Sequence, residues 1–164
     1  MNHFELFDLP VSFRIDKNLL TKKYIALQKK YHPDFYSQEP TADKELALQL
    51  SSQVNTAYKI FQKEDNTIKY VLQLHHLLEE EEKYALPPSF LMEVMEINEA
   101  LMEADKTVTA KVEQLNKEIY ELVKPTLDNY EEGITTEEEL LQIKNYYYQK
   151  KYLNRIADQL DEML

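Results

Sequence analysis

The 164-residue sequence contains no cysteine, and Gly133 is its single glycine. Without cysteine, the chain has no disulfide, no thiol nucleophile and no cysteine-ligated zinc or iron site. One glycine excludes the phosphate-binding loop and the dinucleotide fingerprint, because both need several close approaches of the backbone to a ligand. Few glycines also argue against a sheet-rich fold with many tight turns.

Long hydrophobic runs are also missing. No apolar run approaches about 18 residues, and the N-terminus has no signal-peptide pattern, so we expect a cytoplasmic protein with no membrane partner. The net charge of -11 argues against nucleic acid as a partner. With 43% hydrophobic residues the chain can still form a core. This composition predicts an all-α fold.

The acidic charge is concentrated in the second half of the chain. The first 74 residues carry 10 Lys and Arg against 9 Asp and Glu, whereas the remaining residues carry 9 against 21. The change falls near the acidic tetrad 79–82, which Pro87 and Pro88 follow. We therefore expect two small helical modules, 1–78 and 89–164, joined by a linker at 79–88.

The first module has the pattern of a helical hairpin. A short apolar segment ends at Pro10, Asp16 is a suitable N-cap for a helix that runs to about Tyr31, and another helix follows Thr41. Two long helices with a short connection pack most naturally as an antiparallel pair. Apolar residues recur at spacings of three and four along both, at Leu20, Tyr24, Leu27 and Tyr31 and at Ala47, Leu50, Val54, Ala57 and Phe61.

The second module has three helical patterns. The first runs from Pro88 or Ser89 to about Glu103. In the second, Pro125 is expected to kink the helix or end it early, and Gly133 fits a helix C′ position. Thr135 with Glu138, or Thr136 with Glu139, forms a capping box for the last helix. The expected core stripes are Val108, Val112, Leu115, Ile119 and Leu122 in the second helix and Leu153, Ala157, Leu160 and Leu164 in the last.

The tripeptide His32-Pro33-Asp34 stands where the first long helix must stop. Pro33 disfavours a helical conformation at His32, so the three residues are expected at a rigid corner of the hairpin. One interpretation is an ordinary helix-stop loop. The other is that His32 and Asp34 receive an arginine or a backbone donor from a partner protein.

A run of lysines precedes this corner. Between residues 17 and 30 the sequence has five lysines and no acidic residue. Lys22, Lys23, Lys29 and Lys30 lie opposite the apolar stripe of the same helix. A solvated face would also carry lysines, but such faces usually mix charges of both signs. A purely basic face predicts an acidic partner surface.

With Tyr31-His32-Pro33-Asp34, the basic helix and Asn55-x-Ala57-Tyr58, residues 1–75 resemble a J domain. This module stimulates ATP hydrolysis by 70-kDa heat-shock chaperones of the HscA/DnaK type. The resemblance implies that His32, Pro33 and Asp34 engage the chaperone's ATPase domain near its interdomain linker. It also implies that Lys22, Lys23, Lys29 and Lys30 form the electrostatic docking face.

The helix expected at 89–103 has more apolar residues than one buried face requires. Phe90, Val94, Ile97 and Leu101 supply a sufficient core stripe. Outside that stripe, Met92 lies in line with three glutamates, and Leu91, Met95 and Met102 form an apolar shoulder. The shoulder either packs under the neighbouring module or forms an adaptable partner surface.

The segment Phe90-Leu91-Met92-Glu93-x-x-Glu96, the acidic second half and the total length resemble the HscB family of iron–sulfur co-chaperones. A glycine/phenylalanine-rich linker and a zinc region, as in general J proteins, are absent. The resemblance implies an L-shaped arrangement of a J domain and a C-terminal three-helix bundle that delivers the scaffold protein IscU to the chaperone. Eukaryotic members have an added N-terminal cysteine-rich segment, so a bacterial form is expected. The implied scaffold contacts are Leu91, Met92, Met95, Glu96, Glu99, Glu103 and Tyr152.

Tyr148 and Tyr152 lie one helical turn apart, off the core face of the last helix. Tyr152 occupies a position where the HscB family often has a phenylalanine in the scaffold site, and its hydroxyl makes an identical contact uncertain. Tyr148 fits either the same surface or a buttress at the junction between the modules.

The sequence gives no sign of an enzyme or of a bound metal or cofactor. His32 and Asp34 have no accompanying nucleophile, and no further ligand pattern completes a metal site with His75 and His76. Those two histidines fit a helix end better. Two alternatives to the HscB function stay open: a J protein that serves a different client through 89–164, and a helical adaptor in which His-Pro-Asp is incidental.

Overall fold

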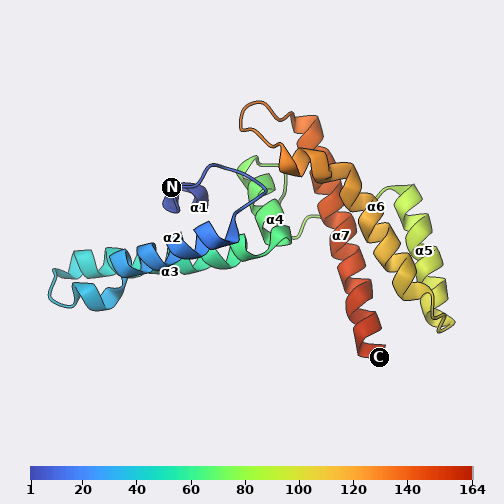
Figure 1. The fold of residues 1–164 in the computed structure, drawn as a ribbon, viewed down its shortest axis with the longest axis horizontal. Helices are drawn as coiled ribbons and strands as arrows, with labels where there is room; N and C mark the ends of the chain where they lie inside the picture. Colours follow the sequence, from blue (N-terminus) through green and yellow to red (C-terminus); the bar gives the residue numbers. More distant parts are fainter. Residues whose placement is uncertain (164) are drawn as a thin grey trace. The chain divides into compact units, whose positions relative to one another are not determined.

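The computed structural model describes residues 1–163, and every regular element in this range is a helix (Figure 1). The predicted all-α fold is therefore confirmed. No helix within residues 1–163 is long and apolar enough to cross a membrane. The elements are α1 (His3–Leu6), α2 (Lys17–Tyr31), the 3₁₀ helix η1 (Pro33–Tyr36), α3 (Thr41–Gln62), α4 (Glu64–Leu74), α5 (Pro88–Met102), α6 (Val108–Asp128) and α7 (Glu137–Met163).

Packing divides the chain into two compact units, Met1–Val71 and a second that begins at Leu72. The division falls within the last turn of α4. The modules 1–78 and 89–164 and the linker 79–88 remain a prediction, because compactness does not establish which segments fold independently.

Helix α2 begins and ends where the sequence predicts. The Asp16 carboxylate accepts hydrogen bonds from the backbone N–H of Asn18 at 2.9 Å and of Leu19 at 3.1 Å, which caps the first turn. At the other end, His32 has φ -61° and ψ 130°, the extended conformation that a following proline favours. The chain therefore turns sharply at the His-Pro-Asp tripeptide.

Polar groups fix α2 against α3. Asn55 Oδ1 accepts hydrogen bonds from the Tyr24 hydroxyl and from Gln28 Nε2, both at 2.8 Å. The Ser51 hydroxyl donates to Gln28 Oε1 at 3.1 Å, and the rings of Tyr24 and Tyr58 stack with centroids 4.0 Å apart. The predicted α2 stripe is consequently only half-buried, except at Leu20. In the α3 stripe Ala47, Val54, Ala57 and Phe61 are buried and Leu50 is half-buried.

Aromatic side chains form the core of the first unit around Phe61. Its ring centroid lies 4.7 Å from that of Phe4, 5.8 Å from that of Phe7 and 6.2 Å from that of Tyr70. Phe4, Phe7 and Phe61 are fully buried, and each such side chain stabilises the fold by about 1.5–3 kcal/mol. The short helix α1 is thus stabilised by its packing on α3, because a helix of this length is not stable by itself.

In the second unit, α6 packs along α7 and α5 packs against α6 (Figure 1). Four of the five residues in the predicted α6 stripe are buried, but the inclusion of Leu122 is wrong because its side chain is 78% exposed. Val123, the next residue, is buried instead. On α5 the stripe is correct at Phe90, Val94 and Ile97, whereas Leu101 is half-buried and Ala100 is buried.

The connection from α6 to α7 differs from the predicted early end of the helix at Pro125 and from the predicted place of Gly133. Helix α6 continues past Pro125 to Asp128, and the Pro125 carbonyl accepts hydrogen bonds from both the backbone and the side-chain N–H of Asn129. Gly133 is not at the C′ position of this helix. It has φ 81° in the following loop, where the Ile134 N–H bonds the Glu131 carbonyl at 3.0 Å and a left-handed residue suits the turn.

Helix α7 begins with the predicted capping box at Thr136 and Glu139. The Glu139 N–H donates to the Thr136 hydroxyl oxygen at 3.1 Å, and the Thr136 N–H donates to Glu139 Oε1 at 3.1 Å. Farther along, the stripe is correct at Leu153 and Leu160, Ala157 is half-buried, and Ile156 is buried although it was not predicted. The predicted core position Leu164 lies outside the described residues.

The segment before α5 is fastened to α7 through Glu82. Its carboxylate accepts hydrogen bonds from Lys144 Nζ at 3.0 Å and from the Tyr148 hydroxyl at 2.8 Å. Tyr84 stacks on Tyr148 with centroids 4.5 Å apart, and its hydroxyl donates to Asn145 Oδ1 at 3.0 Å. Tyr148 therefore holds residues 82–84 in place.

Candidate functional site

The His-Pro-Asp corner presents two polar side chains next to each other. Pro33 opens η1 at a position that needs no N–H donor, and the chain then turns so that Asp34 lies beside His32. The backbone N–H of Asp34 donates to His32 Nδ1 at 3.3 Å, and Asp34 Oδ2 lies 3.6 Å from the same nitrogen. The side chains are 49% and 88% exposed, so both are accessible to a partner.

Two neighbouring residues support this corner. The Tyr36 hydroxyl donates to the Lys30 carbonyl at 2.8 Å, which ties η1 back to the end of α2. The ring of Phe35 makes an edge-to-face contact with the ring of His32 at a centroid distance of 6.1 Å. Phe35 nevertheless remains 67% exposed. A large apolar ring therefore stands in solvent beside the two polar groups.

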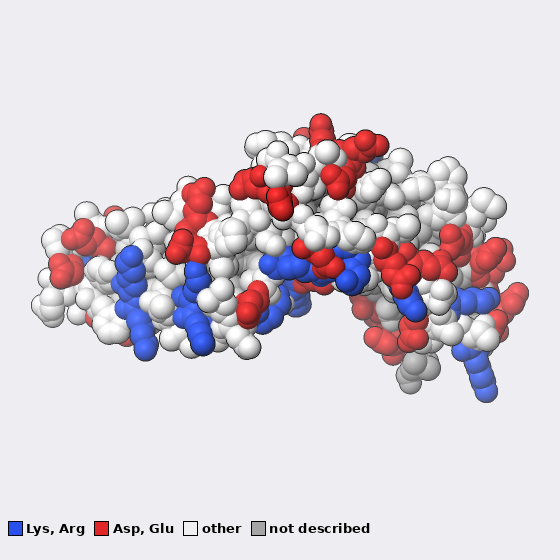
Figure 2. Space-filling view, turned by 45° about the horizontal axis from the view of Figure 1, so that its top comes forward, with Lys and Arg blue, Asp and Glu red and all other residues white. Residues whose placement is uncertain are grey.

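The lysines of α2 do not all have the same environment. Lys22, Lys29 and Lys30 are exposed, whereas Lys23 is half-buried and its Nζ donates to the Asp8 carbonyl at 2.6 Å. Figure 2 shows Lys and Arg side chains spaced along the α2–α3 hairpin. Three of the four predicted docking lysines are thus exposed, with Lys30 Nζ 5.1 Å from the centroid of the Tyr31 ring, and the fourth also holds the loop that precedes α2.

Helix α5 presents an exposed face of mixed apolar and acidic character. Its apolar residues Leu91, Met92 and Met95 are 41%, 67% and 61% exposed. The acidic residues predicted for the same surface, Glu96, Glu99 and Glu103, are exposed as well. Phe90, Val94 and Ile97 are buried on the opposite side of the helix, so the core of the second unit does not include the shoulder. We call these six residues the α5 face.

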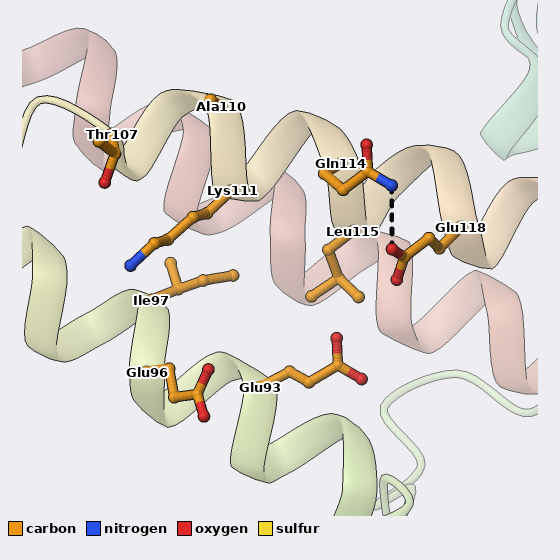
Figure 3. Close-up of a pocket in the computed structure, with 9 residues that line it drawn as sticks. All are labelled: Glu93, Glu96, Ile97, Thr107, Ala110, Lys111, Gln114, Leu115 and Glu118. Carbon is orange, nitrogen blue, oxygen red and sulfur yellow. Dashed lines mark hydrogen bonds between the residues drawn. The ribbon is translucent and has the colours of Figure 1, made fainter.

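A groove borders the α5 face on the side of α6 (Figure 3). It has a volume of about 470 Å³, an apolar floor of Ile97 and Leu115, and carboxylates at its rim. The Lys111 side chain reaches over Ile97, and Gln114 Nε2 donates to Glu118 Oε1 at 3.0 Å. Glu96 belongs to both the groove and the α5 face, so the two surfaces are continuous.

Tyr152 reaches α5 from α7. Its ring meets the ring of Phe90 edge to face at a centroid distance of 6.4 Å, which brings it to the N-terminal end of α5. Tyr152 is half-buried and lines a cleft of about 310 Å³ together with Tyr148, Lys151 and Arg155. The structure does not pair Tyr152 with Tyr148, because the Tyr148 ring stacks on Tyr84 instead.

Burial and hydrogen bonding oppose each other at Glu82. Partial burial raises the pKa of its carboxyl group. The hydrogen bonds from Lys144, Tyr148 and the Glu79 N–H together lower the pKa by more than burial raises it, so the pKa lies below the ordinary value. For Tyr148, burial and then the hydrogen bond to Glu82 raise the pKa of the hydroxyl group above its ordinary value. The hydroxyl therefore remains a donor, and the carboxylate remains an acceptor, at neutral pH.

The two adjacent histidines after α4 have separate roles. His75 Nε2 lies 2.7 Å from the Tyr130 hydroxyl, whereas His76 is exposed in a left-handed conformation with φ 58°. Within residues 1–163, no three His, Asp or Glu side chains converge in the manner of a metal site.

The second half of the chain matches a known family model. Residues 86–161, which include α5, α6 and most of α7, match the model described as the HSCB C-terminal oligomerisation domain. The chain is 38% identical over 102 residues to the co-chaperone protein HscB homolog of Vibrio cholerae (strain M66-2), covering 62% of this chain and 60% of that protein. It is 39% identical over 104 residues to the homolog of Vibrio vulnificus (strain YJ016), covering 63% and 61%. The alignments thus span about three fifths of these relatives.

Two solved structures share the whole fold. The crystal structure of the human co-chaperone protein HscB matches 99% of this chain and 82% of its own chain, with 29% identity and a TM-score of 0.79. The chaperone HscB from Vibrio cholerae matches with 29% identity, a TM-score of 0.65 and 100% coverage of both chains. The chain is thus similar to HscB co-chaperones in fold over nearly its whole length, and its residues 86–161 match the C-terminal domain model of that family.

This similarity agrees with the resemblance in the sequence. The roles of the His-Pro-Asp corner, the lysines, the α5 face and Tyr152 are predictions. The geometry brings His32 to Asp34 and Tyr152 to Phe90, and it leaves the α5 face open.

Sequence reasoning did not identify two features of this chain. Phe35 was not singled out, although a large apolar residue directly after the tripeptide, where no long helix can bury it, is a usable signal. The groove beside α5 was not expected either, because it depends on how α5 crosses α6, and helical periodicity does not determine that angle.

Proposed function

We propose that this protein is a cytoplasmic J-domain co-chaperone that stimulates the ATPase of a 70-kDa chaperone of the HscA/DnaK type and delivers an IscU-type iron–sulfur scaffold to it. The observation that carries the proposal is the corner at which His32 and Asp34 are exposed side by side on a fixed backbone. The names of the relatives as co-chaperones support the same function.

The first unit supplies the features that chaperone binding requires. The corner offers a ring nitrogen and a carboxylate with little entropy left to lose on binding, because Pro33 and the Tyr36 hydroxyl already hold the turn. The exposed residues Lys22, Lys29 and Lys30 add a positive face that would accelerate encounter with an acidic chaperone surface. The pair His32 and Asp34 would then determine whether the encounter activates ATP hydrolysis.

The second unit supplies a surface for the scaffold. The α5 face combines exposed methionine and leucine with glutamates, so it suits a partner patch that is apolar at its centre and basic at its rim. Tyr152 would extend the contact from α7 at the N-terminal end of α5. The description of the matched family model points to oligomerisation through this region, which would compete with the scaffold if it used the same face.

In this proposal the protein performs no chemistry of its own. The cluster is cargo of the scaffold, and a sequence without cysteine offers no thiolate to hold it. The action of the protein would consist of bringing the scaffold and the chaperone together and triggering ATP hydrolysis.

A steady-state ATPase assay of the chaperone, with and without scaffold, tests the proposal directly. The wild-type protein should raise the hydrolysis rate, and the scaffold should raise it further. If the chaperone alone gives the same rate as the mixture, the chain does not act as a J protein. Stimulation without any additional effect of the scaffold would instead favour a different client for the α5 face, which the adaptable character of methionine permits.

A further inference from the structure

All five methionines of the sequence are exposed. Their exposed fractions run from 61% to 88%, and the buried core contains phenylalanine, leucine, isoleucine, valine, alanine and tyrosine but no methionine. Three of the five lie on one helix, α5, at positions 92, 95 and 102. The thioether groups of this protein are therefore concentrated on a surface and not used to fill its interior.

The three methionines of α5 share one side of the helix. Met95 and Met102 are seven residues apart, which is about two turns, so one lies above the other. Met92 precedes Met95 by three residues and is its neighbour on the same side. Glu96 follows Met92 by four residues and Glu99 follows Met95 by four, so each of these two thioethers has a carboxylate one turn away.

We propose that Met92, Met95 and Met102 form an oxidation site at which peroxide converts thioethers to sulfoxides and weakens scaffold binding. The inference rests on the proposed function, because it assumes that the α5 face, together with Met102 beside it, holds the scaffold. In each conversion the sulfur is oxidised and gains one oxygen atom, while hydrogen peroxide is reduced and leaves as water. The S–O bond forms as the peroxide O–O bond breaks, and methionine sulfoxide reductases reverse the change.

The sulfoxide would act on binding for two physical reasons. Its oxygen is a polar acceptor, and placing it in an apolar contact without a donor is unfavourable. At Met92 and Met95 the new oxygen would also stand near the carboxylates of Glu96 and Glu99, which supply no hydrogen-bond donor. Together these effects should weaken scaffold binding by about tenfold or more.

Folding would be largely unaffected by the same reaction. The core has no methionine to oxidise, and the sequence has no cysteine to compete for peroxide. Oxidation would thus change the partner surface and leave the helices packed. This separation of binding from stability distinguishes a modification site from general oxidative damage.

The experiment treats the full chain with dilute hydrogen peroxide, removes the peroxide with catalase, and only then adds an IscU-type scaffold. Peptide mass mapping measures the added oxygen at each methionine, calorimetry measures scaffold affinity, and circular dichroism measures the unfolding temperature. We expect sulfoxide at all three positions of α5, affinity reduced about tenfold or more, and an unfolding temperature close to that of the untreated protein.

A variant with Met92, Met95 and Met102 all replaced by leucine identifies the responsible residues. Each protein is compared with its own untreated sample, so the ratio of affinities before and after peroxide is the readout. The ratio should be large for the wild type and close to one for the variant. Treatment of the oxidised wild type with sulfoxide reductases should restore its affinity for the scaffold. Complete oxidation of the wild type without loss of affinity would overturn the oxidation site and leave the proposed function standing. Failure of the untreated protein to bind scaffold would overturn both.

Discussion

His32 Nδ1 accepts a hydrogen bond from the backbone N–H of Asp34 at 3.3 Å. A ring nitrogen that accepts carries no proton, so in this arrangement a neutral His32 has its proton on Nε2. Asp34 thereby selects the tautomer of the histidine two residues before it. The corner offers a partner one ring donor, Nε2–H, and one carboxylate acceptor, held at a fixed separation.

Replacement of His32 by glutamine should abolish most of the ATPase stimulation. We expect a loss of about tenfold or more, because a contact at the centre of an interface commonly contributes about 2 kcal/mol. The His32 side chain is exposed and its ring contacts the exposed ring of Phe35, so the unfolding temperature should hardly change. The assay compares the variant with His76→Gln, which alters an exposed histidine far from the corner in sequence. Equal loss in both variants would contradict a specific role for His32.

Charge reversal at Lys29 and Lys30 should slow binding to the chaperone. Replacing both by glutamate should reduce the association rate about tenfold at low salt and much less at high salt, because salt screens such interactions. Stopped-flow fluorescence at several ionic strengths measures this effect. Lys59→Glu, which changes an exposed lysine on α3, is the matched control. A change confined to the dissociation rate would argue against electrostatic steering by α2.

Substitutions on the α5 face should weaken scaffold binding without affecting the J-domain activity. Met92→Ala and Glu96→Lys should each cost about 1–3 kcal/mol of binding free energy in calorimetry. Met163→Ala and Glu113→Lys change exposed residues on other helices and should bind as the wild type does. Unchanged affinity in both α5 variants would refute the assignment of this face to the scaffold.

Loss of the Glu82 carboxylate should destabilise the second unit. In Glu82→Gln the ion pair with Lys144 disappears, and we expect the free energy of unfolding to fall by about 1–2 kcal/mol. Because the pKa of Glu82 is lowered in the folded protein, its stabilising effect is complete above the ordinary glutamate pKa of 4.5 and disappears as the pH falls through the folded value.

Urea denaturation at pH 7 and at acidic pH measures this contribution. The difference between wild type and Glu82→Gln should shrink as the pH is lowered. Glu81→Gln changes an exposed neighbouring glutamate and should unfold like the wild type at both pH values. A constant difference at all pH values would indicate that the charge of Glu82 is not what fastens the segment.

Local signals predicted where α2 begins and ends and where α7 begins. Asp16, Pro33 and the Thr136–Glu139 pair act within one helical turn, so they could be identified without knowledge of packing. The error at Leu122 has a different origin. Leu122 and Val123 follow Ile119 by three and four residues, so helical spacing admits either of them, and the packing of α6 buries Val123.

Contacts between distant segments could not be predicted in the same way. Nothing in the local sequence indicates that Glu82 reaches Lys144 and Tyr148, which follow it by 62 and 66 residues. Such contacts depend on tertiary packing, which helical periodicity does not encode. Ile156 is a different case, because it follows Leu153 by three residues and precedes Leu160 by four, so helical spacing admits it as readily as Ala157.

The hydrogen bonds to the shared acceptor Asn55 Oδ1 determine the position of α2 along α3. If α2 slid along α3 by one turn, about 5.4 Å, Tyr24 and Gln28 would both lose their acceptor at once. Apolar side chains alone tolerate such slips, because one methyl group can replace another as a neighbour. The polar layer in the middle of the hairpin therefore fixes the register of α2 against α3. This register sets how far the His32 end of α2 extends from the rest of its unit.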